Sequence, residues 1–137
     1  EEYLISQGIS GVLAEIVSDC LYSLKSVIQE RKEISGVYSY LLDQKYDSYI
    51  RYPYVANTVD RAEEIISYLE SLGYSSRDRW FEPVVFPRST NLESMKYVMG
   101  SCHVAEDISS RIVNLPTGNN VSVQKAKDIS EKILSMK

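Results

Sequence analysis

Cys102 and His103 are the residues of this sequence whose types could form a nucleophile and its general base. His103 is the only histidine of the chain. An imidazole activates a thiol only where the two groups face each other. Adjacent residues on a helix point about 100° apart, so this pair does not meet that requirement. We therefore expect a structural cysteine and an exposed or half-buried histidine.

The sequence also lacks the other residue patterns that are typical of active sites and metal sites. A zinc site usually needs C-x-x-C or H-x-x-x-H spacing, and neither occurs in the sequence. The acidic pairs Glu63-Glu64 and Glu106-Asp107 fit charges on helix surfaces, because a hydrolytic carboxylate pair also needs a cleft. The phosphate-binding patterns G-x-G-x-x-G and G-x-x-x-x-G-K are absent as well. The residues alone indicate no catalytic residue, no metal site and no self-contained active site.

The strongest structural pattern is a run of apolar residues at helical spacing from Ile9 to Leu42, without a proline. An unbroken helix of about 34 residues would be about 50 Å long. A compact domain of this size is under about 40 Å across. The helix would then overhang its own domain and leave part of its apolar stripe to a partner outside this chain. The alternative is a break near Gly36, which would give a self-contained helical hairpin.

The rest of the chain alternates strand and helix signals. Residues 49–55 favour a strand, and Pro53 places it at a sheet edge or at a strand end. A helix capped by Asn57 or Thr58 should end at Gly73. The later elements are an extended segment over 80–87, a short helix over 92–99, a helix ending near Arg111, a strand over 112–115 and a final helix capped by Ser122. We predict an α+β fold with a long N-terminal helix and a sheet of about three short strands, covered by helices on one face.

Eleven tyrosines are a further feature, and six of them lie between positions 38 and 54. Tyrosine offers a rigid aromatic surface with one polar end. The cluster suits an interface or a half-buried sheet, and the sequence leaves both open.

The composition of the chain limits the classes of function that it can have. The 137 residues form one domain or a piece of a larger one, and the formal charge of -4 gives no electrostatic signature of nucleic-acid binding. There is no signal peptide and no apolar run long enough to span a membrane, so we expect a cytoplasmic protein. Cys20 and Cys102 are too few for a disulfide scaffold, and we expect both to be buried as small hydrophobic residues. The start at Glu1, without a methionine and just before a helical pattern, indicates a piece of a longer polypeptide.

Several motifs resemble one known family. Residues 100–106 (GSCHVAE), residues 111–117 (RIVNLPT) and Val121-Ser122 are similar to a C-P-x-A-E helix, a strand ending N-L-P-T and a V-S helix start. These motifs are typical of the small domain of the DegT/DnrJ/EryC1/StrS family of pyridoxal-phosphate (PLP) dependent sugar aminotransferases. Further resemblances are at residues 51–53, 60–64, 69–73 and 79–83.

The N-terminal part resembles the same family. Residues 9–14, 21–24 and 30–32 are similar to the helix that runs from the large domain into the small one. The resemblance therefore covers nearly the whole chain, and it implies an interdomain helical segment over 1–42 and a C-terminal small α+β domain over 43–137. The small domain would have the fold of fold-type-I PLP aminotransferases.

The resemblance implies a full-length enzyme that transfers an amino group, typically from glutamate, to a keto sugar nucleotide. PLP would be its cofactor, a homodimer its expected assembly, and the missing N-terminal large domain the partner of this chain. The family lysine that forms the aldimine lies upstream of this piece, so no catalytic residue is assigned here. Lys25, Lys32 and Lys96 match no such motif.

Site residues follow from the resemblance alone. Arg51, Trp80 and Phe81 are implied to face the sugar pocket, and packing in the sheet and core is their alternative role. Ser6 and Gln7 occupy the position where the family has an Asn that approaches the cofactor phosphate. Ser6-Gln7-Gly8 departs from the family pattern N-Y/F-R, which leaves open a non-catalytic regulatory or binding paralogue. An unrelated helical interaction module, without a sheet, is a third possibility.

Overall fold

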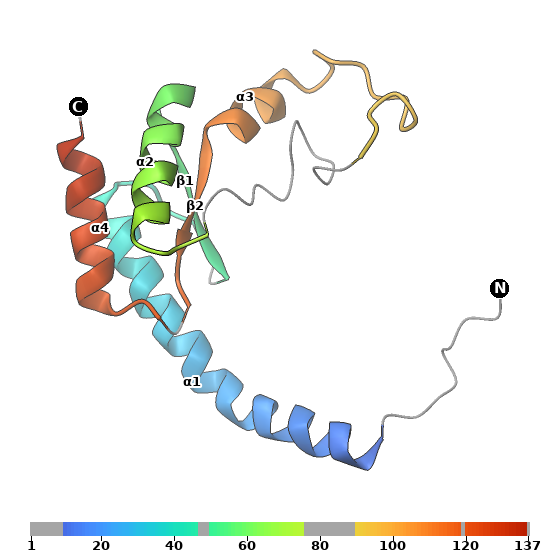
Figure 1. The fold of residues 1–137 in the computed structure, drawn as a ribbon, viewed down its shortest axis with the longest axis vertical. Helices are drawn as coiled ribbons and strands as arrows, with labels where there is room; N and C mark the ends of the chain where they lie inside the picture. Colours follow the sequence, from blue (N-terminus) through green and yellow to red (C-terminus); the bar gives the residue numbers. More distant parts are fainter. Residues whose placement is uncertain (1–9, 47–49, 76–89, 119, 137) are drawn as a thin grey trace.

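The long N-terminal helix and the small domain at its end define the shape of the molecule in a computed structural model (Figure 1). The structure describes residues 10–46, 50–75, 90–118 and 120–136. Their elements are α1 (Gly11–Leu41), β1 (Arg51–Val55), α2 (Val59–Ser71), α3 (His103–Arg111), β2 (Ile112–Pro116) and α4 (Val123–Ser135). Helices α2 and α4 and the C-terminal part of α1 lie together beside the two strands, whereas the N-terminal part of α1 projects away from them.

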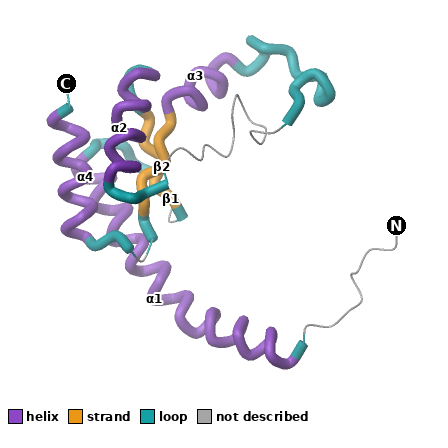
Figure 2. The backbone as a smooth tube through the Cα atoms, in the orientation of Figure 1, coloured by secondary structure: helices purple, strands orange, loops and turns teal. Residues whose placement is uncertain are grey.

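Helix α1 is continuous, and Figure 2 shows it without interruption. It begins where the Ser10 hydroxyl accepts a hydrogen bond from the backbone N–H of Leu13 at 3.3 Å. It continues through Gly36, so the helical-hairpin alternative is wrong. A glycine inside a helix costs about 1 kcal/mol relative to alanine. The neighbouring Ile34 and Tyr38 offset this cost, because both are buried in the core.

Strands β1 and β2 pair in antiparallel fashion, with Tyr52 opposite Leu115 and Tyr54 opposite Val113. Pro53 lies within β1, as expected for an edge strand, and among the described residues β1 pairs with β2 alone. The described residues form two strands rather than the predicted three. The third expected segment, 80–87, lies outside the described residues. The presence of this sheet contradicts the all-helical interaction module.

Helix α2 has the predicted ends. The Thr58 hydroxyl accepts a hydrogen bond from the Arg61 N–H at 3.1 Å, which caps the first turn. Gly73 has φ of +82°, and its N–H donates to the Glu70 carbonyl at 2.9 Å. A left-handed residue is most easily supplied by glycine, so this position ends the helix. Ser122 likewise caps α4, through the N–H of Lys125 at 3.1 Å.

The predicted helix over 92–99 is wrong, because the structure has turns there. The Asn91 side chain accepts hydrogen bonds from the N–H groups of Glu93 and Ser94, at 2.9 and 3.2 Å. Lys96 then adopts φ of 55°, and Gly100 follows with φ of 90°. These left-handed residues interrupt a helix that the apolar spacing alone would favour.

The core is built around two tyrosines that belong to the predicted cluster. Tyr38 and Tyr52 are fully buried, and their ring centroids lie 5.3 Å apart. The Tyr38 hydroxyl donates to the carbonyl of Pro116 at 3.1 Å, which ties α1 to β2. Burial, and secondarily the nearby Tyr74, raises the pKa of Tyr38 well above its ordinary value. Tyr38 and Tyr52 therefore pack in the core and do not form an exposed interface.

The cysteine prediction is also wrong, because Cys20 and Cys102 are both exposed. Cys20 lies on the projecting part of α1, and Cys102 immediately precedes α3, so neither position is covered by the core. Among the described residues, no helix has the length and apolar character needed to cross a membrane.

Candidate functional site

The N-terminal part of α1 carries an apolar face that nothing in the described structure covers. Val12 is 71% exposed, and Ile28, the last exposed member, is 36% exposed. The members of this free face are Val12, Leu13, Ile16, Val17, Leu21, Leu24 and Ile28. At 3.6 residues per turn they lie on the same side of α1 as Ile34, Tyr38 and Leu42, which are buried. The free face is therefore the continuation of a buried face beyond the edge of the domain.

The free face is large enough to matter energetically. The exposed fractions of its seven side chains add up to about three and a half whole aliphatic side chains. Burying one such side chain contributes roughly 1.5–3 kcal/mol, so covering the face would contribute roughly 5–10 kcal/mol. Exposed apolar patches on this scale are typical of interaction surfaces. The structure thus agrees with the expected overhang of the helix.

Arg51, the predicted pocket residue, lines a cleft at one end of the sheet. The cleft has a volume of about 320 Å³, and Arg31 of α1 lines it too. The Arg31 Nη1 donates to the Ile50 carbonyl at 3.2 Å, and the Thr117 hydroxyl donates to the same carbonyl at 2.8 Å. Both arginines have further interactions in the structure. The cleft is thus lined by two arginines from distant parts of the chain.

This cleft can recognise an anion. The remaining lining residues are Ile50, Gly73, Tyr74, Ser75, Pro116, Gly118 and Asn120, and no acidic residue is among the described lining residues. Guanidinium groups bind phosphate and carboxylate groups well. Sequence reasoning missed Arg31, although a charged residue between the apolar positions Val27 and Ile34 of one helix face was a signal that could have identified it.

The other predicted site residues are not placed. Trp80 and Phe81, assigned to the sugar pocket, and Ser6 and Gln7, assigned to the cofactor phosphate, lie outside the described residues. Arg51 is therefore the one predicted site residue whose surroundings the structure gives.

The segment that resembles the C-P-x-A-E helix has a structural role. Glu106 accepts hydrogen bonds from the Tyr97 hydroxyl and from the Gly100 N–H, both at 2.7 Å. These bonds, that of Tyr97 first, lower the pKa of Glu106. Glu106 thereby holds the turn over 97–100 against the start of α3. Cys102 and His103 are exposed beside it, and the expected surface histidine is confirmed.

The described residues contain no metal-ligand cluster, and the three lysines considered above are exposed. Lys25, Lys32 and Lys96 are all exposed, whereas a lysine that forms a Schiff base is usually enclosed. No group of three or more His, Cys, Asp or Glu residues in the described part of the chain could hold a metal ion.

Comparison of the chain with protein-family models finds no match. Comparisons with curated proteins and with solved structures also find none.

Proposed function

We propose that this chain is the C-terminal small domain of a PLP-dependent aminotransferase that acts on a keto sugar nucleotide. Glutamate would be the amino donor, and the cofactor and its lysine would belong to the large domain that precedes this piece. The role of the chain is to pack against that domain and to close one side of the substrate pocket.

The observation that carries the proposal is the free face of α1. The apolar face of α1 is buried at its C-terminal end and, among the described residues, exposed for its first five turns, which favours a second body beside the small domain. A large domain joined to the N-terminal end of α1 would lie beside this face and could cover it. The order of elements, a long helix followed by strand, helix, helix, strand and helix, agrees with the order that the motifs imply.

The cleft at Arg51 supports the substrate class. A sugar nucleotide carries a diphosphate group, and arginine, of which Arg31 and Arg51 line the cleft, is a residue type suited to such an anion. In this proposal Arg51 is a substrate-binding residue rather than a catalytic one, and Trp80 and Phe81 retain their proposed place in the sugar pocket.

The complete open reading frame that encodes this chain tests the proposal. We expect an upstream segment with a PLP lysine, and the purified full-length protein should absorb at the band of an internal aldimine. Borohydride treatment should abolish that band and fix the cofactor on the lysine. An open reading frame without such a segment would contradict the proposal.

The second candidate is a non-catalytic binding or regulatory paralogue of the same fold. The sequence Ser6-Gln7-Gly8 at the position of the family's cofactor-contacting Asn favours it. Such a protein would have the upstream domain but would show no aldimine band when PLP is added. The same absorbance measurement therefore separates the two candidates.

A further inference from the structure

The edge of β1 that faces away from β2 carries main-chain groups that another strand could bind. Among the described residues β1 pairs with β2 alone. Directly after β1, the Ala56 N–H donates to the Arg111 carbonyl at 3.0 Å, on the β2 side. Because successive residues of a strand point their main-chain groups to opposite edges, the N–H and C=O of Val55 face the other edge. Such edges are the places where strands of different chains pair.

The side chain of Gln44 occupies this edge at Val55. Its Nε2 donates to the Val55 carbonyl, and its Oε1 accepts a hydrogen bond from the Val55 N–H, both at 2.9 Å. A side-chain amide has an acceptor and a donor in one plane, so it can make the pair of bonds that a residue of a neighbouring strand would make. Pro53, two residues earlier at the same edge, has no N–H. Neither position therefore offers a donor to another strand.

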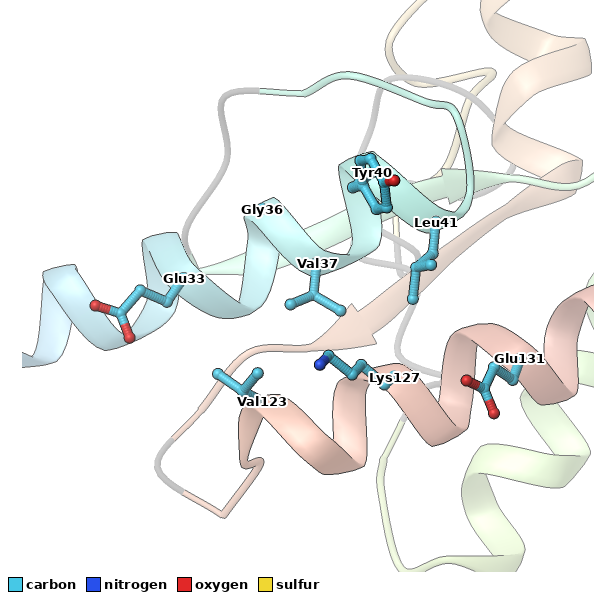
Figure 3. Close-up of a pocket in the computed structure, with 8 residues that line it drawn as sticks. All are labelled: Glu33, Gly36, Val37, Tyr40, Leu41, Val123, Lys127 and Glu131. Atoms are coloured by element: carbon cyan, nitrogen blue, oxygen red, sulfur yellow. The ribbon is translucent and has the colours of Figure 1, made fainter.

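The segment that carries Gln44 is attached to the sheet by contacts of its own. Helix α1 ends at Leu41, and Figure 3 shows the chain turning back after it. Asp43 provides the turn with φ of 52°. The hydroxyl of the buried Tyr52 donates to the Gln44 carbonyl, and Tyr46 packs edge-on against the Tyr52 ring, with ring centroids 5.8 Å apart. These contacts hold the Gln44 amide in position beside Val55.

We propose that Gln44 takes the place of a neighbouring strand and closes the end of β1 to strand addition by other chains. Its amide satisfies the donor and the acceptor that an extended segment of another chain would need. A single side chain also ends the ladder of hydrogen bonds, whereas an added strand would present a new edge. This role depends on the contacts of Gln44 alone and is independent of the proposed function.

Amide hydrogen exchange of the 137-residue chain, followed by NMR, tests the contact itself. Gln44→Ala removes both bonds to Val55, so the Val55 amide should exchange at least about tenfold faster. The Ala56 amide is the internal reference, because its bond to the Arg111 carbonyl does not involve Gln44. Its exchange should change by less than about twofold. Unchanged exchange at Val55, or equal acceleration at both amides, would overturn the proposal.

Association of the chain, measured by sedimentation equilibrium at up to about 100 μM, tests the closure of the edge. All samples carry Leu24→Glu, which makes association through the free face unfavourable. Gln44→Ala should raise the association constant at least about tenfold over this parent, because the Val55 edge becomes available to another chain. Adding Val55→Pro removes the N–H that the other chain would bind and no bond to β2, so it should restore the mass of the parent.

Gln124→Ala is the matched control, because the Gln124 amide donates to Asp128 at 2.9 Å on the exposed surface of α4. It should leave both association and Val55 exchange unchanged. Gln44→Asn keeps the amide on a side chain one methylene shorter, and it should associate as Gln44→Ala does if that variant does not fold. The proposal is overturned if the Gln44 variant associates no more strongly than its parent, if Val55→Pro does not reverse the association, or if Gln124→Ala associates equally.

Discussion

The two halves of α1 have the same sequence pattern but different surroundings. In the C-terminal half the apolar face is buried against β2 and α4, and Ile34 and Tyr38 belong to the core. In the N-terminal half the same face is exposed from Val12 to Ile28. Helical periodicity specifies which side of a helix is apolar, but the partner that covers this side can belong to another body. The buried C-terminal half of the apolar face therefore stabilises this chain, whereas the exposed N-terminal half is available to a partner.

The largest contrast should come from removing the same atoms in both halves. Ile34→Ala deletes a side chain that is 4% exposed, and Ile16→Ala deletes one that is 54% exposed. We expect Ile34→Ala to lower the free energy of unfolding by about 2–5 kcal/mol through the cavity it leaves. Ile16→Ala should change it by less than about 0.5 kcal/mol. Urea denaturation of the isolated chain measures both.

Equal losses of stability for the two variants would mean that the free face is already covered in the isolated chain. The proposed enzyme with a preceding large domain allows a second measurement of the same pair of variants. There Ile16→Ala should become costly if a large domain packs on the free face, whereas Ile34→Ala should cost about as much as before.

The tyrosines of the two halves give a smaller contrast. Tyr38→Phe removes the hydroxyl that donates to the Pro116 carbonyl at 3.1 Å and leaves that carbonyl without this partner. We expect a loss of about 1–2 kcal/mol in the free energy of unfolding. Tyr22→Phe, on the exposed half, should change it by less than about 0.5 kcal/mol. A cost for Tyr22→Phe as large as that for Tyr38→Phe would show that the exposed half is ordered by contacts of its own.

The same tyrosine makes stability depend on alkaline pH. Burial raises the pKa of Tyr38 above the ordinary value of 10.0. A raised pKa in the folded state means that the contribution of Tyr38 is fully present below about pH 10 and is lost as the pH rises beyond it. The stability difference between wild type and Tyr38→Phe should therefore shrink above pH 10. Guanidinium titrations of both proteins between pH 8 and 11 measure it, and a constant difference would contradict the burial of this hydroxyl.

Local signals in the sequence predicted much of the fold. Thr58, Gly73 and Ser122 mark helix ends by hydrogen bonds to neighbouring residues, and such short-range chemistry is readable from the chain itself. The turn at Asn91 was missed for the opposite reason. Apolar spacing there favours a helix, but the side-chain hydrogen bonds of Asn91 and the left-handed Gly100 favour turns.

The candidate site was harder to predict because it depends on contacts between distant residues. Arg51 was assigned to a pocket, but its neighbour Arg31 lies 20 positions away and reaches the cleft only once α1 packs beside β1. The exposure of Cys20 is similar, since a cysteine on an apolar stripe is buried only where that stripe is covered. Periodicity carries no information on where the domain ends along the helix.

The helix caps provide the smallest contrast, because Ser122 caps α4 within the domain and Ser10 caps the free end of α1. Each hydroxyl accepts one N–H bond, at 3.1 Å from Lys125 and at 3.3 Å from Leu13. Ser122→Ala should lower the free energy of unfolding by about 1 kcal/mol, since losing the cap of a helix packed in the core destabilises the whole fold. Ser10→Ala should only fray the first turns of α1, which lie outside the cooperative unit. Circular dichroism should then show a small loss of helix at 25 °C with an unchanged urea midpoint, whereas a shifted midpoint would mean that the free half of α1 folds together with the domain.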